Sequence, residues 1–177
     1  MQIEKEKTKI LFTANEIQDK IKEIATKINF HYLEEEIHVI CVLKGSVMFT
    51  VDLVKHLDMP IKMEFIRLSS YGSSVTSSGK VHAVDISLPD LNNKHVLIVE
   101  DIVDTGLTAR FLLDFIDNNF RTKTTKLCSL LDKKCFRKTS IEPDYFGFEV
   151  DDKFVVGYGL DYDGYYRNLP YIGYIED

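Results

Sequence analysis

Three carboxylates stand within five residues at the end of an apolar run in VLIVEDIVDTGLT, residues 96–108. They are Glu100, Asp101 and Asp104. Like charges this close repel one another, so such a cluster is costly unless a cation or hydroxyl groups lie among them. Carboxylates are good acceptors for paired hydroxyls, such as those of a ribose. The apolar run predicts a buried strand, which would place the cluster at a strand end.

The residues that follow the cluster are typical of a phosphate-binding turn. Thr105 and Thr108 supply hydroxyl donors, and Gly106 allows a ligand to approach the backbone closely. A helix that begins near Thr105 would add free N–H groups and the positive end of its dipole. The pattern indicates a ribose phosphate ligand, with Asp104 left as a general base. The surplus negative charge predicts a divalent cation nearby.

The hydrophobic pattern predicts the elements that must position these residues. Thr13-Ala-Asn-Glu16 has the form of a capping box, and isoleucines recur after it at helical spacing. The run 37–43 is nearly all apolar and rich in β-branched residues, as strands buried on both faces of a parallel sheet are. Strands then alternate with helices, which predicts an open, mainly parallel, twisted α/β sheet flanked by helices, with ligands at the carboxyl ends of its strands. The other elements expected are helices over 47–57 and 107–115 and strands over 61–68, 81–86, the start of 96–108, 126–131 and 154–158.

Length and composition predict one domain over residues 1–177, because 45% hydrophobic residues can bury one good core. Segment 69–80 holds six serines and two glycines and almost nothing that could pack, so we expect a mobile loop there. The tail 158–175 is too rich in tyrosine to be disordered. We expect it to pack over the sheet edge, in a small hood formed by the terminal segments.

Charge and cysteine content exclude several classes of protein. A net charge of −6 and a pI near 5.4 argue against a general nucleic-acid binder. Cys41, Cys128 and Cys135 have no metal-type spacing and are expected to be buried or free thiols in a reducing compartment. The amino terminus has no apolar signal region, and no apolar run reaches membrane-spanning length. We therefore expect a cytoplasmic protein with neither nucleic acid nor membrane as a partner.

Residues 96–108 resemble the phosphoribosyl pyrophosphate signature of the type I phosphoribosyltransferases: four apolar residues, an acidic pair, two apolar residues, Asp-Thr-Gly and Thr. The signature alone says nothing about the acceptor base. Four more segments resemble the hypoxanthine-guanine phosphoribosyltransferases in order and spacing, so the resemblance covers nearly the whole chain. They are LKGS (43–46), SSYGSS (69–74), LLDKK (130–134) and DKFVVGYGLDYDGYYRNLP (152–170).

The resemblance implies how phosphoribosyl pyrophosphate is bound. Glu100 and Asp101 would hold the ribose hydroxyls, and the turn 104–108 would cradle the 5′-phosphate, with Asp104 as the catalytic residue near N7 of the purine. Leu107 stands where some relatives have lysine, so backbone amides must bind this phosphate. The implied binding set is Lys44, Gly45, Glu100, Asp101, Asp104, Thr105, Gly106, Leu107, Thr108 and Arg167.

The resemblance also implies a pyrophosphate site and a metal. Lys44 and Gly45 would meet pyrophosphate through a strained, often cis, peptide, and Arg167 would contact it as well. A Mg²⁺ cofactor would lie between the acidic residues. The implied metal-binding set is Glu100, Asp101 and Asp161.

The base site is implied by the family pattern and not by the residues on their own. Lys133 would donate to the purine 6-oxo group, Phe154 would stack on the ring, and carbonyls near Val155 and Asp161 would read a 2-amino group. Without the resemblance we would expect Lys133 to be solvated and Phe154 to belong to the core. The ranking of hypoxanthine, guanine and xanthine stays open.

The implied reaction is the displacement of pyrophosphate from C1 of the sugar by N9 of a 6-oxopurine, hypoxanthine or guanine, which gives IMP or GMP in purine salvage. A loop carrying Ser70 and Tyr71 would close over the reacting centre and exclude water. The alternative for this loop is a passive connector. The implied assembly is a homodimer or homotetramer.

Three other interpretations compete with this one. A HAD-type phosphatase needs Asp-x-Asp-x-Thr, whereas Asp101, Asp104 and Thr105 are spaced one residue too long. A phosphoribosyltransferase for another base is disfavoured by the context of Lys133 and Phe154. A regulator that senses phosphoribosyl pyrophosphate and binds nucleic acid would need a basic face or an added module, and no spare segment could supply either.

Overall fold

The computed structural model describes residues 8–70 and 81–175. The bounds of the elements, in chain order, are β1 Thr8–Phe12, α1 Ala14–Tyr32, β2 Ile37–Leu43, α2 Val47–Val54, β3 Ile61–Ser70, β4 Val81–Asp85, β5 His95–Val103, α3 Leu107–Asn119, β6 Thr124–Asp132, β7 Tyr145–Glu149, β8 Val155–Val156 and β9 Ile172–Ile175. A short 3-10 helix, Lys134–Phe136, follows β6.

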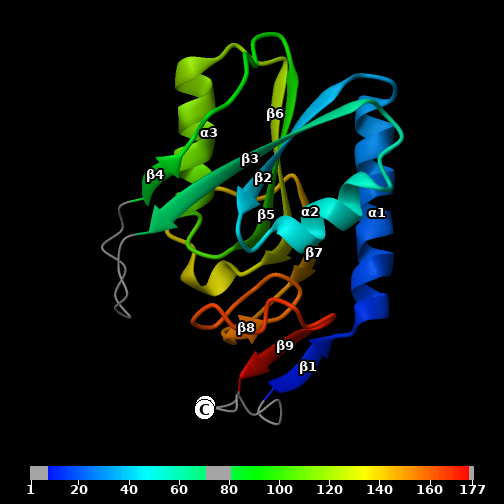
Figure 1. Cartoon of the computed structure of the whole chain (residues 1–177), viewed down its shortest axis with the longest axis vertical. Helices are drawn as coiled ribbons and strands as arrows, with labels where there is room; N and C mark the ends of the chain where they lie inside the picture. Colours follow the sequence, from blue (N-terminus) through cyan, green and yellow to red (C-terminus); the bar gives the residue numbers. More distant parts are fainter. Residues whose placement is uncertain (1–7, 71–80, 176–177) are drawn as a thin grey trace.

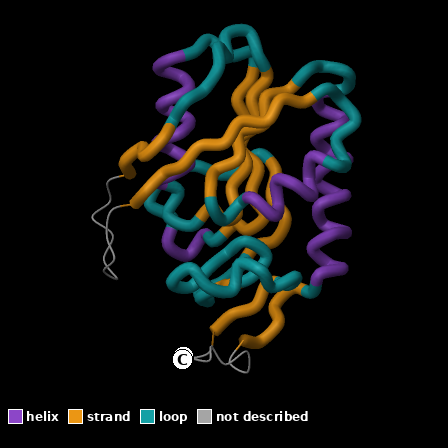
Figure 2. Tube along the Cα trace, viewed as in Figure 1, coloured by secondary structure: helices purple, strands orange, loops and turns teal. Residues whose placement is uncertain are grey.

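The strands form two sheets. The central sheet has the order β4-β3-β2-β5-β6-β7, and a separate small sheet has the order β1-β9-β8 (Figures 1 and 2). Strands β3, β2, β5, β6 and β7 run parallel, and only the edge strand β4 pairs antiparallel among the described strands of this sheet. The open, mainly parallel sheet that the sequence predicts is confirmed.

Helices cover both faces of the central sheet. Side chains along β2 and β5 alternate between two hydrophobic clusters, because successive strand residues point to opposite faces. Val39 packs in the cluster that includes α1 and α2, and Ile40 packs in the cluster that includes α3. The predicted capping box of α1 is present, since the Glu16 N–H donates to Thr13 Oγ1 and the Thr13 N–H donates to the Glu16 carboxylate.

The small sheet is the predicted hood. It joins the two ends of the described chain, because β1 pairs antiparallel with β9. The hood lies next to the carboxyl ends of the parallel strands (Figure 1). Gly159 of this region sits so close to the turn after β2 that a Cβ there would collide with the carbonyl oxygen of Gly45. The hood therefore borders the edge of the sheet where ligands of such folds bind.

Several predicted boundaries are wrong. Strands β1, β7 and β9 were not expected; β1 and β9 pair with each other from opposite ends of the chain, a contact that no local pattern reveals. Helix α2 ends at Val54 and not at residue 57. The strand predicted over 154–158 is reduced to β8, because Gly157 and Tyr158 have positive φ angles and begin a tight turn.

Two further expectations can be compared with the structure. Cys41, Cys128 and Cys135 are all free thiols, and the first two are buried. Within residues 8–70 and 81–175, no helix is both long enough and apolar enough to cross a membrane. Most of the loop expected over 69–80, including Tyr71, lies outside the described residues, so its mobility stays a prediction.

Candidate active site

The carboxyl ends of β2 and β5 meet the hood around two adjoining pockets. The pockets share Glu100, Asp101 and Thr108. Leu107 is the one member of the predicted binding set that lines neither of them. The first pocket is lined by Glu100, Asp101, Ile102, Val103, Asp104, Thr105, Gly106, Thr108 and Ala109. The second is lined by Val42, Leu43, Lys44, Gly45, Leu68, Glu100, Asp101, Thr108, Asp161 and Arg167.

Glu100 and Asp101 are two neighbouring carboxyl groups at the end of β5. Glu100 is buried, and its Oε1 has no hydrogen-bond partner among the described residues. Burial raises the pKa of Glu100 well above its ordinary value, and the Asp101 charge adds to this effect. Burial also raises the pKa of Asp101 to about 6, although the backbone N–H of Ile102 donates to its carboxylate. The pair therefore favours any ligand that brings positive charge or hydroxyl donors.

Asp104 begins the turn that connects β5 to α3. Gly106 is the N-cap of α3 and adopts a left-handed conformation with φ of 77°, which favours glycine. The helix exposes its first N–H groups here, as a phosphate site requires. Asp104 Oδ1 is buried without a described partner, and burial raises the pKa of this carboxyl despite the opposing charges of Lys133 and Arg137. The turn thus combines the free N–H groups of a helix start with a carboxyl group of raised pKa at its first residue.

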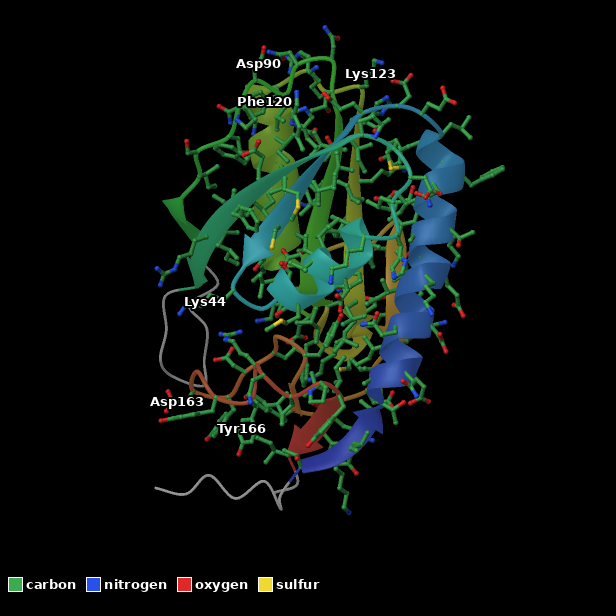
Figure 3. All side chains as sticks on the ribbon, turned by 45° about the vertical axis from the view of Figure 1, so that its right-hand side comes forward. Lys44, Asp90, Phe120, Lys123, Asp163 and Tyr166 are labelled. Carbon is green, nitrogen blue, oxygen red and sulfur yellow. The ribbon has the colours of Figure 1, made fainter. Side chains whose placement is uncertain are left out.

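The turn after β2 faces the same acidic pair. The Leu43–Lys44 peptide bond is cis, as the resemblance implies. A Cβ on Gly45 would collide with the Asp101 carboxylate, so a larger residue here would displace that side chain. Figure 3 shows Lys44 at the end of the sheet that faces the hood. Its exposed ammonium group is therefore available to an anionic ligand in the second pocket.

Asp161 and Arg167 line the second pocket from the segment between β8 and β9 of the hood. Arg167 Nη2 lies 2.6 Å from Asp161 Oδ1, and its Nη1 donates to the Gly159 carbonyl oxygen at 2.6 Å. The second Asp161 oxygen accepts from the Gly164 N–H at 2.8 Å. These contacts hold the guanidinium at the pocket wall, where it can bind an anion.

The three remaining residues of the predicted base site are Lys133, Phe154 and Val155. Lys133 is only 8% exposed; its Nζ donates to the Lys153 carbonyl oxygen at 3.0 Å and lies 3.6 Å from Asp152. Phe154 is 53% exposed, with its ring edge-to-face against Tyr162 at 5.4 Å. Both findings reverse what the residue types alone suggest, since the lysine is buried and the phenylalanine is exposed. Val155, the third, is buried in β8.

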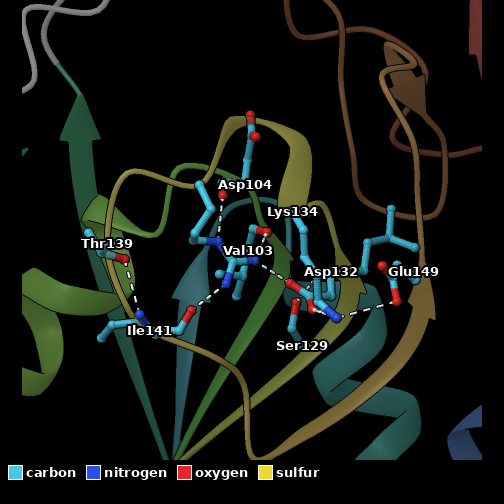
Figure 4. Close-up of polar contacts among 10 residues, drawn as sticks. Val103, Asp104, Ser129, Asp132, Lys134, Thr139, Ile141 and Glu149 are labelled. Carbon is cyan, nitrogen blue, oxygen red and sulfur yellow. Dashed lines mark hydrogen bonds and ion pairs between the residues drawn. The ribbon is translucent and has the colours of Figure 1, made fainter.

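Arg137 and Asp132 are polar residues of this region that the sequence did not identify. Asp132 is 1% exposed at the end of β6 and forms an ion pair with the Arg137 guanidinium. Arg137 also donates to the carbonyl oxygens of Val103 and Asp104 (Figure 4). Asp132 lies inside the LLDKK segment and ends an apolar run, which could have drawn attention to it. Nothing in the local pattern identifies Arg137.

The acidic residues fit a cation that is bound mainly by its substrate. The partnerless Glu100 oxygen and the raised pKa values of Glu100 and Asp101 favour a positive charge at this point. In the described part of the chain, no group of three or more His, Cys, Asp or Glu side chains could hold an ion by itself. This arrangement suits Mg²⁺, which is commonly bound by one or two carboxylates together with substrate phosphates.

Comparison with known proteins agrees with this geometry. The model of the phosphoribosyl transferase domain matches residues 8–163. The chain is 44% identical over 168 residues to a hypoxanthine-guanine phosphoribosyltransferase of Bacillus subtilis, covering 95% of this chain and 93% of that one. A hypoxanthine-guanine phosphoribosyltransferase of Aquifex aeolicus is 42% identical, and the match covers 99% of each chain. The crystal structure of a Bacillus anthracis hypoxanthine-guanine phosphoribosyltransferase matches with a TM-score of 0.89 and 40% identity, covering 95% of this chain and 98% of that one. The chain belongs to the hypoxanthine-guanine phosphoribosyltransferase family.

Proposed function

We propose that this chain transfers the 5-phosphoribosyl group from phosphoribosyl pyrophosphate to N9 of hypoxanthine or guanine, releasing pyrophosphate and giving IMP or GMP. The observation that carries the proposal is the carboxyl-end site itself. An acidic pair with raised pKa values lies between a phosphate-type helix start and a cationic turn. Phosphoribosyl pyrophosphate carries its groups in the matching order, with the ribose between the 5′-phosphate and the pyrophosphate.

The residues around the turn would bind and orient the sugar. The N–H groups from Thr105 to Thr108 hold the 5′-phosphate, and the hydroxyls of the two threonines add donors. Glu100 and Asp101 accept from the ribose hydroxyls. Positive charge develops on the sugar as pyrophosphate departs, so these fixed carboxylates favour the transition state.

Other residues would bind the leaving group and accept the proton. Lys44 and Arg167 bind pyrophosphate, and Asp104 accepts a proton from N7 of the purine. Glu100, Asp101 and Asp161 would hold Mg²⁺ together with the substrate, and the ion would supply positive charge that masks the pyrophosphate. The raised pKa of Asp104 suits a general base, since proton transfer is most efficient when the pKa approaches the working pH.

Recognition of the base would depend on Lys133. A lysine ammonium only donates, so it satisfies the 6-oxo oxygen of hypoxanthine or guanine and meets the 6-amino group of adenine donor to donor. Phe154 exposes its ring for stacking, and backbone carbonyls near Val155 and Asp161 contact a 2-amino group. Lys133 is buried with its Nζ on the Lys153 carbonyl oxygen, so adenine would leave another of its donors without an acceptor, which costs binding free energy.

The proposal is tested by assaying nucleotide formation with hypoxanthine, guanine, xanthine and adenine in the presence of Mg²⁺. We expect adenine to be rejected by about 10⁴-fold or more. Lys133→Gln should lose most of the hypoxanthine activity and narrow the gap to adenine, because the amide offers a donor or an acceptor. Lys134→Gln, in the exposed neighbouring lysine, is the matched control. Comparable use of adenine by the unaltered enzyme, or an unchanged hypoxanthine rate in Lys133→Gln, would refute the 6-oxopurine assignment.

The remaining parts of the functional hypothesis concern the closing loop and the assembly. Ser70 and Tyr71 would carry a lid that excludes water, and protease should cut within 69–80 more slowly when a charged transition-state mimic is bound. We expect a homodimer or homotetramer in the cytoplasm. Met48, Val51 and Phe65 are exposed apolar side chains that suit a subunit contact, and sedimentation would give the number of subunits.

A further inference from the structure

The segment that follows β6 lies directly against the phosphate turn. We define residues 133–141 as the brace. The Lys133 N–H donates to the Val103 carbonyl oxygen at 3.0 Å, and the Lys138 N–H donates to the Thr105 carbonyl oxygen at 2.9 Å. A Cβ on Gly106 would collide with the Thr139 hydroxyl. The brace therefore fixes the turn through its backbone and leaves the ligand side open.

Arg137 is the middle residue of the brace. Its Nε donates to the Asp104 carbonyl oxygen at 2.9 Å, and its Nη2 donates to the Val103 carbonyl oxygen at 3.0 Å. The same guanidinium donates to the Ile141 carbonyl oxygen and to the Asp132 carboxylate. Its side chain is only 12% exposed, and Asp132 is buried beneath it. One planar group thus joins the end of β5, the end of β6 and the far end of the brace.

This arrangement determines how Asp104 is held. One oxygen of its carboxylate is buried without a described partner, and the hydrogen bond from Arg137 Nε to the Asp104 carbonyl oxygen fixes the backbone that carries this side chain. Lys133 is fixed by the neighbouring carbonyl of Val103. We propose that Arg137, held by Asp132, is a positioning residue that sets Asp104 and the phosphate turn relative to Lys133. The inference rests on the proposed function, in which Asp104 is the base and Lys133 reads the purine.

The geometry requires arginine. A lysine at this position would keep the charge and could still reach Asp132, but a single ammonium group cannot span the carbonyls of Val103, Asp104 and Ile141 in fixed directions. The turn should then shift by a fraction of an ångström. A displacement of about 1 Å can reduce an enzymatic rate by about 10²-fold. We expect Arg137→Lys to lower kcat roughly 10- to 100-fold and to raise KM for phosphoribosyl pyrophosphate.

The decisive experiment is a double-mutant cycle with Asp104→Asn. If Arg137 acts through Asp104, Arg137→Lys should lower kcat strongly in the unaltered chain and only slightly in the Asp104→Asn background. The rise in KM should persist in both, because it arises in the turn. Arg110→Lys is the matched control, since the exposed Arg110 donates to Ser140 of the brace and pairs with Asp114. Equal kcat losses in both backgrounds, or a lowered melting temperature with unchanged kinetics, would overturn the inference.

Hydrogen exchange separates this inference from the proposed function. Arg137→Lys should speed amide exchange in peptides covering 103–108 without a matching change elsewhere, and Arg110→Lys should not. The exchange measurement remains informative even if the chain forms no nucleotide. A chain that forms no nucleotide would refute the proposed function but not the positioning role of Arg137. If Arg137→Lys does not fold, Asp132→Asn takes its place. It should also speed amide exchange at 103–108, by a smaller factor. Exchange at 103–108 that stays unchanged, or rises uniformly over the chain, would refute the positioning role.

Discussion

Glu36 at the amino end of the central sheet and the Glu100–Asp101 pair at its carboxyl end have opposite surroundings. At the amino end, Glu36 lies 3.4 Å from Lys62 and 3.7 Å from Lys94, and the hydrogen bond from Lys62 lowers the pKa of this exposed carboxyl. At the carboxyl end, Glu100 and Asp101 adjoin each other, and burial raises the pKa of both. Both ends are visible in Figure 3, with the hood beside the second.

This difference indicates which charges serve the fold and which serve a ligand. Glu36 has two lysine partners, Lys62 of β3 and Lys94 just before β5, so the folded chain satisfies it. A buried carboxylate without a partner costs free energy, and such groups persist where a ligand completes them. The contrast predicts large functional effects at the carboxyl end and small structural effects at the amino end.

Removal of Mg²⁺ should have the largest effect. We expect nucleotide formation to stop in a chelator and to return when Mg²⁺ is added, because pyrophosphate would otherwise leave as a poorly stabilised anion. Asp161→Ala should raise the Mg²⁺ concentration needed for half-maximal rate. Full activity in the chelator would show that the reaction does not require the metal.

Asp104→Asn should have the next largest effect. The substitution keeps the shape of the side chain but loses the proton acceptor, so kcat should fall by roughly 10²-fold or more with little change in binding of phosphoribosyl pyrophosphate. Glu36→Gln, the same loss of a charge at the other end of the sheet, should leave kcat unchanged. Turnover by Asp104→Asn at the unaltered rate would exclude the role of general base.

Asp101→Asn should stabilise the ligand-free protein. The pKa of Asp101 is raised to about 6, so the folded state binds this proton more tightly than the unfolded chain does. This group therefore makes the free energy of unfolding rise as pH falls from about 7 to 4. The variant should gain up to about 3 kcal/mol at pH 7.5 and lose that part of the pH dependence. Thermal melts between pH 4 and 8 measure both; a lower melting temperature at pH 7.5 would contradict the assignment.

Glu36→Gln should have the smallest effect and the opposite sign. The pKa of Glu36 is lowered, so its contribution to stability is present above the unfolded pKa and is lost as pH falls through the folded value. An exposed ion pair contributes little, so the melting temperature at pH 7 should fall by about one degree or less, and added salt should remove the difference. A large loss that salt does not reduce would show that this end is not simply a solvated ion-pair cluster.

The sequence predicts the fold well where the signal is local. The capping box and isoleucine stripe of α1 and the β-branched run of β2 appear in the structure as predicted. Strands β1 and β9 could not be predicted, because they pair across almost the full length of the chain. Strand β8 was predicted too long because the positive φ angles at Gly157 and Tyr158 end it early.

The residues of the candidate site also differ in whether a local sequence pattern identifies them. Residues 100–108 are contiguous, so their types and spacing alone indicate a ribose phosphate site. Lys133 and Phe154 required a family resemblance, since burial of a lysine and exposure of a phenylalanine are set by tertiary structure. Arg137 was missed because its partners are backbone carbonyls of another strand, which no residue pattern encodes.

The central claim is that Glu100 and Asp101, which form no ion pair with the described residues, receive their positive partners only when the substrate and its metal bind. Carboxyl pKa values measured by NMR titration in the free protein and with Mg²⁺ and phosphoribosyl pyrophosphate test it most directly. We predict that Asp101 titrates near 6 and Glu100 above its ordinary value in the free protein, that Glu36 titrates below its ordinary value, and that only the first two fall when the ligands bind. An Asp101 that titrates near 3.9, the value of an unperturbed aspartate, and does not respond to the ligands would contradict the account.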